Sequence, residues 1–468
     1  MFKKALCLAM VAVLAISMAA CASSAPSGST AAPSGNTPSS PSTSDAAPVE
    51  ASNPADTQAQ LRIIWWGSQT RHEYTQAALD VFTEKYPNIT FSSEFVAFDG
   101  YWQKLATMSA SKSLPDVLQQ DYKYITQYAK NDLIIDMKPY IENGILDLSD
   151  SPESMWSSGI VDDKLVGICL GVNSTVSMIN TELFAQAGIE VPPHNWSYDE
   201  YIVVLDQLLA KKDELGIHFP EQGVQNNCYE ITAARLRQNG MSFFATDGSN
   251  AFGFEKEEGR KVILEYIQQE KENIEMGRSA PLAVRDEAHV NGAESGPIVR
   301  GQAAILTGQW SNQIKAVSNA AGKPFTLVAV PDLLPGDTKA QFIKPSQFFS
   351  VATNSQYKDQ AVFFVNAVTN DIDVNMELKA ERGVPISDTV RAALAETFDP
   401  DSVDKTVFDF ISEIAPVASP TPVAEPTTYG SVFELLKNLF KTIIDEGGDP
   451  DKAFDAFYDQ AMTEFQMA

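Results

Sequence analysis

Between Leu61 and Asp121, short apolar runs alternate with segments of helical pattern. The run LRIIWWG (61–67) is continuously apolar, as in a buried strand. The helical pattern RHEYTQAALDVFTEKYPN follows and ends at Pro87. ITFSSEFVAF then predicts a second strand, YWQKLATMSASK a second helix and LPDVLQQD a short third strand. Because strands joined through a helix run parallel, this order predicts a parallel sheet with helices on both faces.

The remainder of the chain predicts more than one such unit. Of the 468 residues, 408 follow Gln60, and the alternation resumes after KLVGICLGVN, with helices expected at Thr181–Ala187, Tyr198–Leu215 and Lys256–Asn273. A single doubly wound sheet rarely takes up this much chain, so we expect two α/β lobes. Ligands of open parallel sheets bind beyond the carboxyl ends of the strands, so two facing lobes predict a cleft.

The N-terminus has the pattern of a secretory signal peptide. An apolar run from Ala5 to Ala20 follows Lys3 and Lys4, and it is shorter than the roughly 18 to 20 residues that cross a bilayer. Two small residues directly precede Cys21, whose thiol is available for acylation. We therefore expect a signal peptide over residues 1–20. The alternative is an ordinary signal that is cut elsewhere and leaves Cys21 as a free thiol.

Residues 21–60 are rich in Ser, Pro, Ala and Thr and contain hardly any large apolar side chain. Such a segment buries too little surface to offset its ordering entropy, so we expect a disordered tether. A diacylglyceryl group on Cys21 would supply the two or more acyl chains that hold a protein stably at a membrane. The folded body would then stay near the membrane and remain free to reorient.

The charge and the cysteine and histidine patterns argue against several kinds of partner and site. The formal net charge of −27 argues against nucleic acids and anionic polymers as partners. In the body only Cys169 and Cys228 could pair, and without CxxC spacing we expect buried free thiols. No HExxH motif or metal-ligand cluster includes the scattered histidines, so we predict no metal and no cofactor. These are His72, His194, His218 and His289.

Six stretches in sequence order give the body a family resemblance. They are WWGSQTRHEYTQAALDVFTEKYPNI, YWQKLATMSASKSLPDVLQQD, RGQAAILTGQW, VAVPDLLPG, ERGVPIS and YGSVFELLKNLFKTIIDEGGDPDKAFDAF. In order and spacing they resemble the extracellular solute-binding proteins of carbohydrate-uptake ABC transporters, a large family related to maltose-binding proteins. The resemblance implies a two-lobed periplasmic-binding-protein-like α/β fold with a ligand cleft between the lobes.

The resemblance also implies three crossings between the lobes. We expect these crossings near Val172–Ser177, Val328–Pro331 and Gly383–Ile386. Lobe 1 would then comprise 61–172 plus 331–382, and lobe 2 would comprise 177–328 plus 386–468.

The stretch MAAC resembles the lipobox of bacterial lipoproteins, although Met18 stands where Leu is usual. This implies a membrane contact through the lipid on Cys21 only, with the body on the extracellular side, or on the periplasmic side in a cell with an outer membrane. The family implies the membrane subunits of an ABC transporter as partners of the closed form. We expect a monomer.

A sugar presents an apolar ring face to aromatic side chains and a hydroxyl edge to carboxylates, amides and Arg. At the end of the first strand we expect Ser68, Gln69 and Arg71 as donors at the cleft rim. One of Trp65 and Trp66 would point inward, and the alternative is two core tryptophans beside a solvated turn.

Further candidates lie at strand ends and crossings. The resemblance implies that Asp121 accepts bonds from sugar hydroxyls, and its alternative role is to cap the helix YKYITQYAK. Trp310 is expected to stack on the ligand, with a core position as the alternative. Asn173 could bond the ligand at the first crossing, and its alternative role is to bond the backbone of the crossing itself. Phe348 and Tyr429 are weaker candidates, for which packing is the alternative.

The stretch DEGGDPDKA superficially resembles a calcium loop, but it lacks the EF-hand spacing. Asp449 followed by Pro450 instead predicts a helix N-cap with proline at the first helical position.

An enzyme and a scaffold are the competing functions. A secreted glycoside hydrolase or esterase is the main rival, but the sequence has neither a GxSxG elbow nor a histidine-centred constellation. A scaffold or adhesion protein would predict repeats, and no fixed period is present. We therefore expect a binding protein for a mono- or oligosaccharide and no enzymatic activity. Arg71 could pair with a uronate or with neutral hydroxyls, so the kind of sugar stays open.

Overall fold

The computed structural model describes residues 53–467, apart from seven positions within that range. These are Ser68, Ala97, Gln225, Asn226, Gly292, Pro335 and Asp337. The predicted signal peptide, Cys21 and most of the predicted tether lie outside the described residues. Within the described part of the chain, no helix is both long and apolar enough to cross a membrane.

The first five elements follow the predicted alternation. They are β1 (Ala59–Trp66), α1 (Gln69–Lys85), β2 (Ile89–Val96), α2 (Phe98–Ala110) and β3 (Val117–Gln120). β1 runs parallel to both β2 and β3, which confirms the predicted parallel arrangement of this part. β1 is a central strand, and all but two of its eight side chains are buried.

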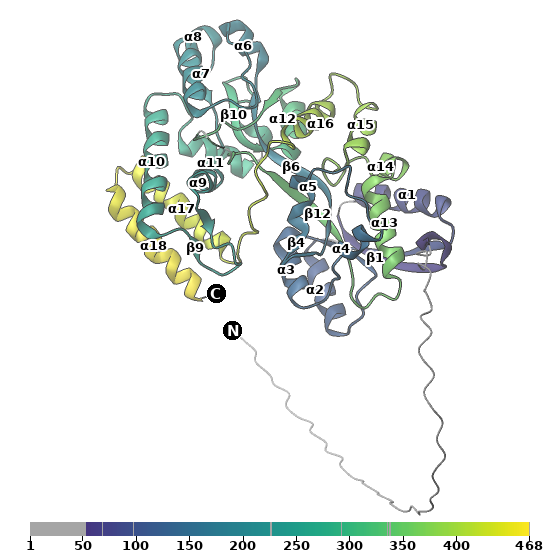
Figure 1. Ribbon diagram of the computed structural model, residues 1–468. Helices are drawn as coiled ribbons and strands as arrows, with labels where there is room; N and C mark the ends of the chain where they lie inside the picture. The colour runs from purple at the N-terminus through teal and green to yellow at the C-terminus, as the bar shows by residue number, and fades with distance from the viewer. Residues whose placement is uncertain are drawn as a thin grey trace, which may run out of the picture. The chain divides into compact units, whose positions relative to one another are not determined.

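Among the described residues the main sheet has eight strands, in the order β2-β1-β3-β12-β6-β10-β7, with β11 paired to β6. β12 (Ile343–Val351) is antiparallel to β3 and to β6 (Ile168–Ile179), and β10 (Ala303–Trp310) is antiparallel to β6. The sheet is therefore mixed beyond its first three strands. Figure 1 shows β6 and β12 side by side in the middle of the body.

The remaining strands are short, and helices surround the sheet (Figure 1). The strands are β4 (Ile160–Val161), β5 (Lys164–Leu165), β7 (Phe219–Glu221), β8 (Ser242–Phe244), β9 (Phe252–Gly253) and β11 (Thr326–Val328). The first helices are α3 (Tyr122–Lys130), α4 (Lys138–Glu142), α5 (Glu153–Trp156), α6 (Thr181–Ala187), α7 (Tyr198–Ala210), α8 (Lys212–Leu215), α9 (Asn227–Gln238), α10 (Lys256–Glu275) and α11 (Leu282–Asn291). The later helices are α12 (Ile314–Ala321), α13 (Lys358–Asn370), α14 (Ile372–Leu378), α15 (Asp388–Ala395), α16 (Val403–Ile414), α17 (Tyr429–Ile444) and α18 (Pro450–Met467). Short 3₁₀ helices are η1 (Pro54–Asp56), η2 (Ser157–Gly159), η3 (Ala293–Ser295) and η4 (Ser311–Gln313).

The predicted helices at 181–187 and 256–273 are confirmed as α6 and α10. The single helix expected over Tyr198–Leu215 is instead two, α7 and α8, because Lys211 leaves helical geometry with φ −110° and ψ 12°. The next helix, α8, ends at Leu215, and Gly216, with a positive φ of 66°, caps it.

Buried apolar side chains form three main clusters. The largest joins β1, β3, β6 and β12 to helices that include α13, α15 and α16. A second lies among α9, α10, α17 and α18, and a third packs the end of β6 against α6 and α7.

All three segments that were predicted to cross between the lobes meet at β6. The first lies within β6, and the other two pair with it. Val172 and Val384 exchange backbone hydrogen bonds of 2.8 and 3.1 Å, and Val328 pairs with Ser177. Gly383 has a φ of 106°, and an added Cβ would lie 3.0 Å from the Val172 carbonyl oxygen, so this approach requires glycine. After Val328 the chain passes through Asp332, which forms a β-bridge with Ser197, before it enters β12. The lobe boundaries themselves stay a prediction.

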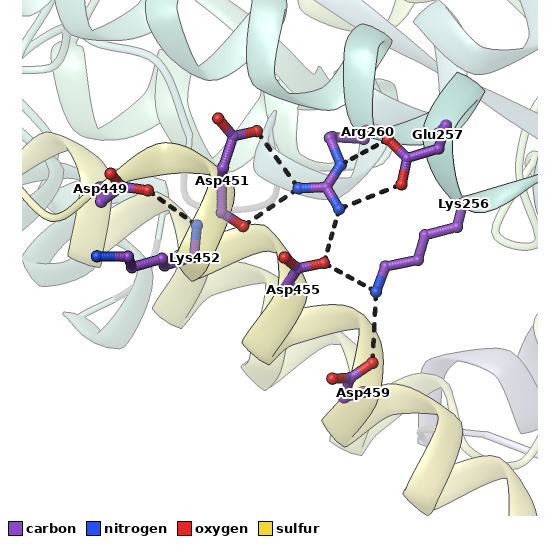
Figure 2. A network of polar contacts seen from close by, with 8 residues as sticks. All are labelled: Lys256, Glu257, Arg260, Asp449, Asp451, Lys452, Asp455 and Asp459. Carbon is purple, nitrogen blue, oxygen red and sulfur yellow. Dashed lines mark hydrogen bonds and ion pairs between the residues drawn. The ribbon is translucent and has the colours of Figure 1, made fainter.

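The C-terminal helix α18 is fixed to α10 by an ion-pair network (Figure 2). Arg260 bonds Asp455 at 2.6 Å and Asp451 at 3.3 Å, and Lys256 pairs with Asp455 at 2.8 Å. At the start of α18 the Asp449 carboxylate accepts the backbone N–H of Lys452 at 3.0 Å. Because α18 begins at Pro450, the predicted N-cap is confirmed.

Candidate functional site

A cavity of about 290 Å³ lies where α3, α9, β8 and β12 meet the segment that precedes α17. Its wall contains several aromatic side chains, namely Tyr122, Tyr229, Phe243, Phe244 and Phe342. We call it the first cavity. The Tyr122 hydroxyl donates to the Pro422 carbonyl at 2.7 Å, which ties α3 to the segment before α17.

Four charged side chains also line the first cavity, two of each sign: Arg237, Lys344, Glu230 and Glu425. The Arg237 guanidinium lies 5.0 Å from the centre of the Phe342 ring and donates to the Ala340 carbonyl at 3.1 Å. The Lys344 ammonium lies 4.9 Å from the centre of the Trp310 ring. Aromatic faces and charged hydrogen-bonding groups thus meet in one cavity.

The electrostatics of the first cavity are dominated by burial. Burial raises the pKa of Glu230 to about 7, and Glu425 adds to the shift while Lys344 and Arg237 oppose it. Burial also lowers the pKa of Arg237, and the negative charge of Glu230 opposes that shift. At neutral pH Glu230 therefore lies close to its titration point.

A second cavity of about 760 Å³ is lined by α1, by residues of β6 and β12, and by α14, α15 and α16. We call it the second cavity. In its wall the Arg71 side chain bonds Glu381 at 2.5 Å and donates to the Trp66 carbonyl at 3.1 Å. Asn173 lines it as well and accepts a bond from the Ser311 hydroxyl at 3.4 Å.

The two cavities adjoin a common pair of strands. Lys344 of the first cavity stands opposite Asn173 of the second in the register of β12 and β6. Of the predicted site residues that the structure describes, Arg71 and Asn173 line the second cavity and none lines the first; the others lie beside the first cavity, in the core or at the surface.

Three predicted aromatic residues pack in the core. Trp65 is fully buried and donates its indole N–H to His72 Nδ1 at 3.0 Å. Trp66 is 6% exposed and packs against Tyr101, and Phe348 is fully buried. Both tryptophans are buried because β1 is covered on both faces. For all three residues, this position is the packing role that the sequence analysis gave as the alternative to contact with the ligand.

The polar candidates near α1 and α3 have local partners. Asp121 caps α3 by accepting the backbone N–H of Lys123 at 2.9 Å, and burial raises its pKa. Gln69 is exposed and donates to Glu73 at 3.0 Å. Ser68 lies outside the described residues.

Trp310 and Tyr429 adjoin the first cavity through their ring contacts. Trp310 ends β10 and is half-buried, edge-on to Phe342 at 6.0 Å between ring centres. Tyr429 begins α17 and lies 5.0 Å from Tyr229, also between ring centres. Burial raises the pKa of Tyr429.

Sequence reasoning missed the contribution of α9 to the first cavity. Tyr229, Ala233 and Arg237 stand four residues apart in CYEITAARLR and share one helix face, so the periodicity carried a detectable signal. The segment 421–425 carried no comparable signal, because its sequence TPVAE indicates only an extended chain.

The predicted free thiols are confirmed. Cys169 and Cys228 are unpaired and buried, and burial raises the pKa of each to about 12. Such thiols are poor nucleophiles and metal ligands. The described residues contain no group of three acidic, histidine or cysteine side chains that could hold a metal ion.

Solved structures of solute-binding proteins share this fold. An extracellular solute-binding protein of family 1 from Alicyclobacillus acidocaldarius has a TM-score of 0.77 at 24% identity, over 88% of this chain and 99% of its own. A periplasmic oligogalacturonide-binding protein from Yersinia enterocolitica has a TM-score of 0.71 at 20% identity, over 87% and 99%. The sugar-binding protein MalE from Xanthomonas citri has a TM-score of 0.65 at 16% identity, over 87% and 98%. The predicted two-lobed α/β fold is thereby confirmed.

Sequence comparison gives the family. A curated relative from Brucella abortus is 24% identical over 123 residues, which is 26% of this chain and only 29% of that relative's length. The sequence pattern of the bacterial extracellular solute-binding proteins matches residues 77–402, or 326 of the 468 residues. The chain therefore belongs to the bacterial extracellular solute-binding protein family.

Proposed function

We propose that this protein is a lipid-anchored extracellular substrate-binding protein that captures a mono- or oligosaccharide and delivers it to an ABC importer. The observation that carries the proposal is the first cavity, where aromatic rings and charged side chains of both signs face the same space. This combination suits a ligand with apolar ring faces and a hydroxyl edge.

Each part of the first cavity has a role in this proposal. The rings of Tyr122 and Tyr229 offer faces for sugar C–H groups, and Glu230 and Glu425 accept bonds from hydroxyls. Lys344 donates to the ligand, and if it moves off the Trp310 ring it frees that face for stacking. Asp121 and Tyr429 adjoin this cavity, whereas Arg71 and Asn173 line the second cavity and are weaker candidates.

The similar proteins support a carbohydrate ligand. The Yersinia protein is described as oligogalacturonide-binding, and a Listeria monocytogenes ABC substrate-binding protein was solved with cycloalternan, with a TM-score of 0.55 at 18% identity. At 18 to 20% identity, similarity to these structures shows a shared fold and no more. The sugar class and the importer therefore come to this chain as part of the proposal.

Binding without catalysis is part of the same proposal. A de novo designed cysteine esterase has a TM-score of 0.73 at 21% identity to this chain. That likeness concerns the fold alone, and the described cysteines here are buried with raised pKa values. The family itself is one of binding proteins.

The lipid anchor is supported by the sequence MAAC alone. Cys21→Ser should leave a soluble, unlipidated precursor, because a hydroxyl cannot form the thioether. The measurement is membrane fractionation with intact-mass analysis. Unchanged mass and membrane association would remove the anchor from the proposal.

A thermal-shift screen over mono- and oligosaccharides tests the binding function. A ligand that binds only the native state stabilises it by about 2.7 kcal/mol at a concentration of about 100 Kd. The proposal predicts a raised melting temperature with at least one glycan. No shift with any glycan, together with turnover of one of them, would overturn it.

A further inference from the structure

His194 joins two parts of the chain that are far apart in the sequence. Its Nδ1 accepts the backbone N–H of Ala329 at 3.2 Å, and its Nε2 lies 2.6 Å from a carboxylate oxygen of Glu413 on α16. The ring also meets Phe410 of α16 edge-on, with 5.5 Å between the ring centres. His194 therefore links α16 to residues 328–331, the predicted second crossing.

These contacts define the tautomer of the neutral ring. A backbone N–H can only donate, so Nδ1 of His194 carries no proton, and the proton on Nε2 is donated to Glu413. Ala329 is 4% exposed, and among the described residues His194 is the one acceptor for its N–H. The bond to Ala329 thus requires neutral imidazole.

A proton on Nδ1 of His194 breaks that bond. Histidine is the side chain that ordinarily takes up a proton between about pH 8 and about pH 5. With the ring protonated, two N–H groups face each other, so the ring has to turn away from Ala329 and leaves a buried N–H without an acceptor. The Glu413 carboxylate attracts the charged ring, so the contact with α16 is kept.

The charged groups around this link come from two parts of the chain. They are Lys405, Asp409 and Glu413 of α16, and Asp332 and Lys339 between β11 and β12. Asp409 pairs with Lys405 at 2.6 Å, and Asp332 pairs with Lys339 at 2.9 Å. β11 and residues 191–196 contribute no ionisable side chain besides the histidine itself. Of these side-chain types, histidine is the one that ordinarily changes charge between about pH 5 and about pH 8.

We propose that His194 is a pH-sensitive link between α16 and residues 328–331. Neutral His194 bonds both Glu413 and Ala329, whereas protonated His194 stays on Glu413 and releases Ala329. Acid therefore removes one bond that holds the predicted second crossing. The inference rests on these contacts alone and is independent of the sugar proposal.

Other bonds keep residues 328–331 in place when His194 releases Ala329. The Trp196 indole donates to the Ala329 carbonyl at 2.7 Å, and the backbone N–H of Val330 donates to Gln341 Oε1 at 3.0 Å. Indole and amide groups do not change charge between about pH 5 and about pH 8. The adjacent amides of Ala329 and Val330 therefore differ in whether their hydrogen bond depends on pH.

Hydrogen exchange of the sugar-free, full-length protein at about pH 8 and about pH 5 tests this link, with mass spectrometry that resolves single amides. After correction for intrinsic exchange rates, protection of the Ala329 amide should be about tenfold or more lower at the acidic pH, because its N–H loses its acceptor. Protection of the Val330 amide should change less than about threefold, and it reports any general opening of the protein.

Substitutions separate the link from other effects of pH. His194→Asn offers an oxygen in place of Nδ1 that does not titrate, so Ala329 should be equally protected at both pH values. His194→Phe keeps a ring beside Phe410 and removes the acceptor, so Ala329 should be weakly protected at both. His218→Asn alters an exposed histidine and should keep the wild-type response. Circular dichroism establishes that each variant is folded.

Three results would overturn the proposal. They are equal protection of the wild-type Ala329 amide at both pH values, an equally large loss of protection at Val330, or a wild-type response in folded His194→Asn. The comparison of the two wild-type amides needs no substitution, so it decides the matter even where a variant does not fold.

Discussion

Replacing Glu230 with glutamine should change how the stability of the protein depends on pH. Burial raises the pKa of this carboxyl group from 4.5 to about 7 in the folded protein. Between these values the folded state binds one more proton than the unfolded state. The free energy of unfolding should therefore fall as pH rises through this window, by at most about 1.4 kcal/mol per pH unit.

The total effect follows from the width of the window. A full shift would remove about 3 kcal/mol between pH 4.5 and pH 7. The side chain keeps part of its surface open to the first cavity, so solvent reduces this value. We expect Glu230→Gln to match wild type near about pH 4, below the unfolded pKa, and to be about 1 to 3 kcal/mol more stable relative to wild type near about pH 8.

Urea unfolding of sugar-free protein at several pH values measures this difference. Glu425→Gln should reduce the pH dependence without abolishing it, because burial is the larger cause of the Glu230 shift and Glu425 a smaller one. Glu84→Gln, an exposed position on α1, should follow wild type at every pH. A stability difference between Glu230→Gln and wild type that stays constant from about pH 5 to about pH 8 would refute the argument.

Three further predictions concern the ligand, the cleft and the C-terminus. Trp310→Ala should weaken glycan affinity about 5-fold to 150-fold in calorimetry, as expected for about 1 to 3 kcal/mol of stacking; large loss of stability with affinity retained would give Trp310 a core role. Glycan binding should reduce the radius of gyration in small-angle scattering, and an unchanged curve at saturation would argue against closure. Arg260→Met should lower the melting temperature at low salt and less at about 1 M salt, because the acidic partners of Arg260 on α18 are exposed; equal losses would contradict an electrostatic cause.

The sequence predicted local structure well where neighbouring residues determine it. The order β1, α1, β2, α2, β3 follows from apolar periodicity, and Asp449 with Pro450 marks the start of α18. The break at Lys211 was missed because the helical pattern continues into α8, and only the backbone geometry there separates the two helices.

The mixed sheet could not be predicted from the same signals. β12 pairs with β6 through Lys344 and Asn173, which are far apart in the sequence. Strand direction there depends on tertiary pairing, and an apolar run carries no information about it.

The residues that line the first cavity were not predicted, although the predicted Asp121, Trp310 and Tyr429 adjoin it. Trp65 and Trp66 lie in a strand covered on both faces, where a continuous apolar run cannot show which side chain reaches a cleft. Tyr229 and Arg237 were detectable on one face of α9, but nothing local indicates that this face meets α3 and β12.

Calorimetric titration with a glycan from the thermal-shift screen tests the central claim most directly, when one variant of each cavity is compared with wild type. Tyr229→Ala alters the first cavity and Lys379→Met the second. The account predicts that Tyr229→Ala weakens glycan binding about tenfold or more, while Lys379→Met binds like wild type. Full affinity in Tyr229→Ala together with loss of binding in Lys379→Met would contradict it and assign the glycan to the second cavity.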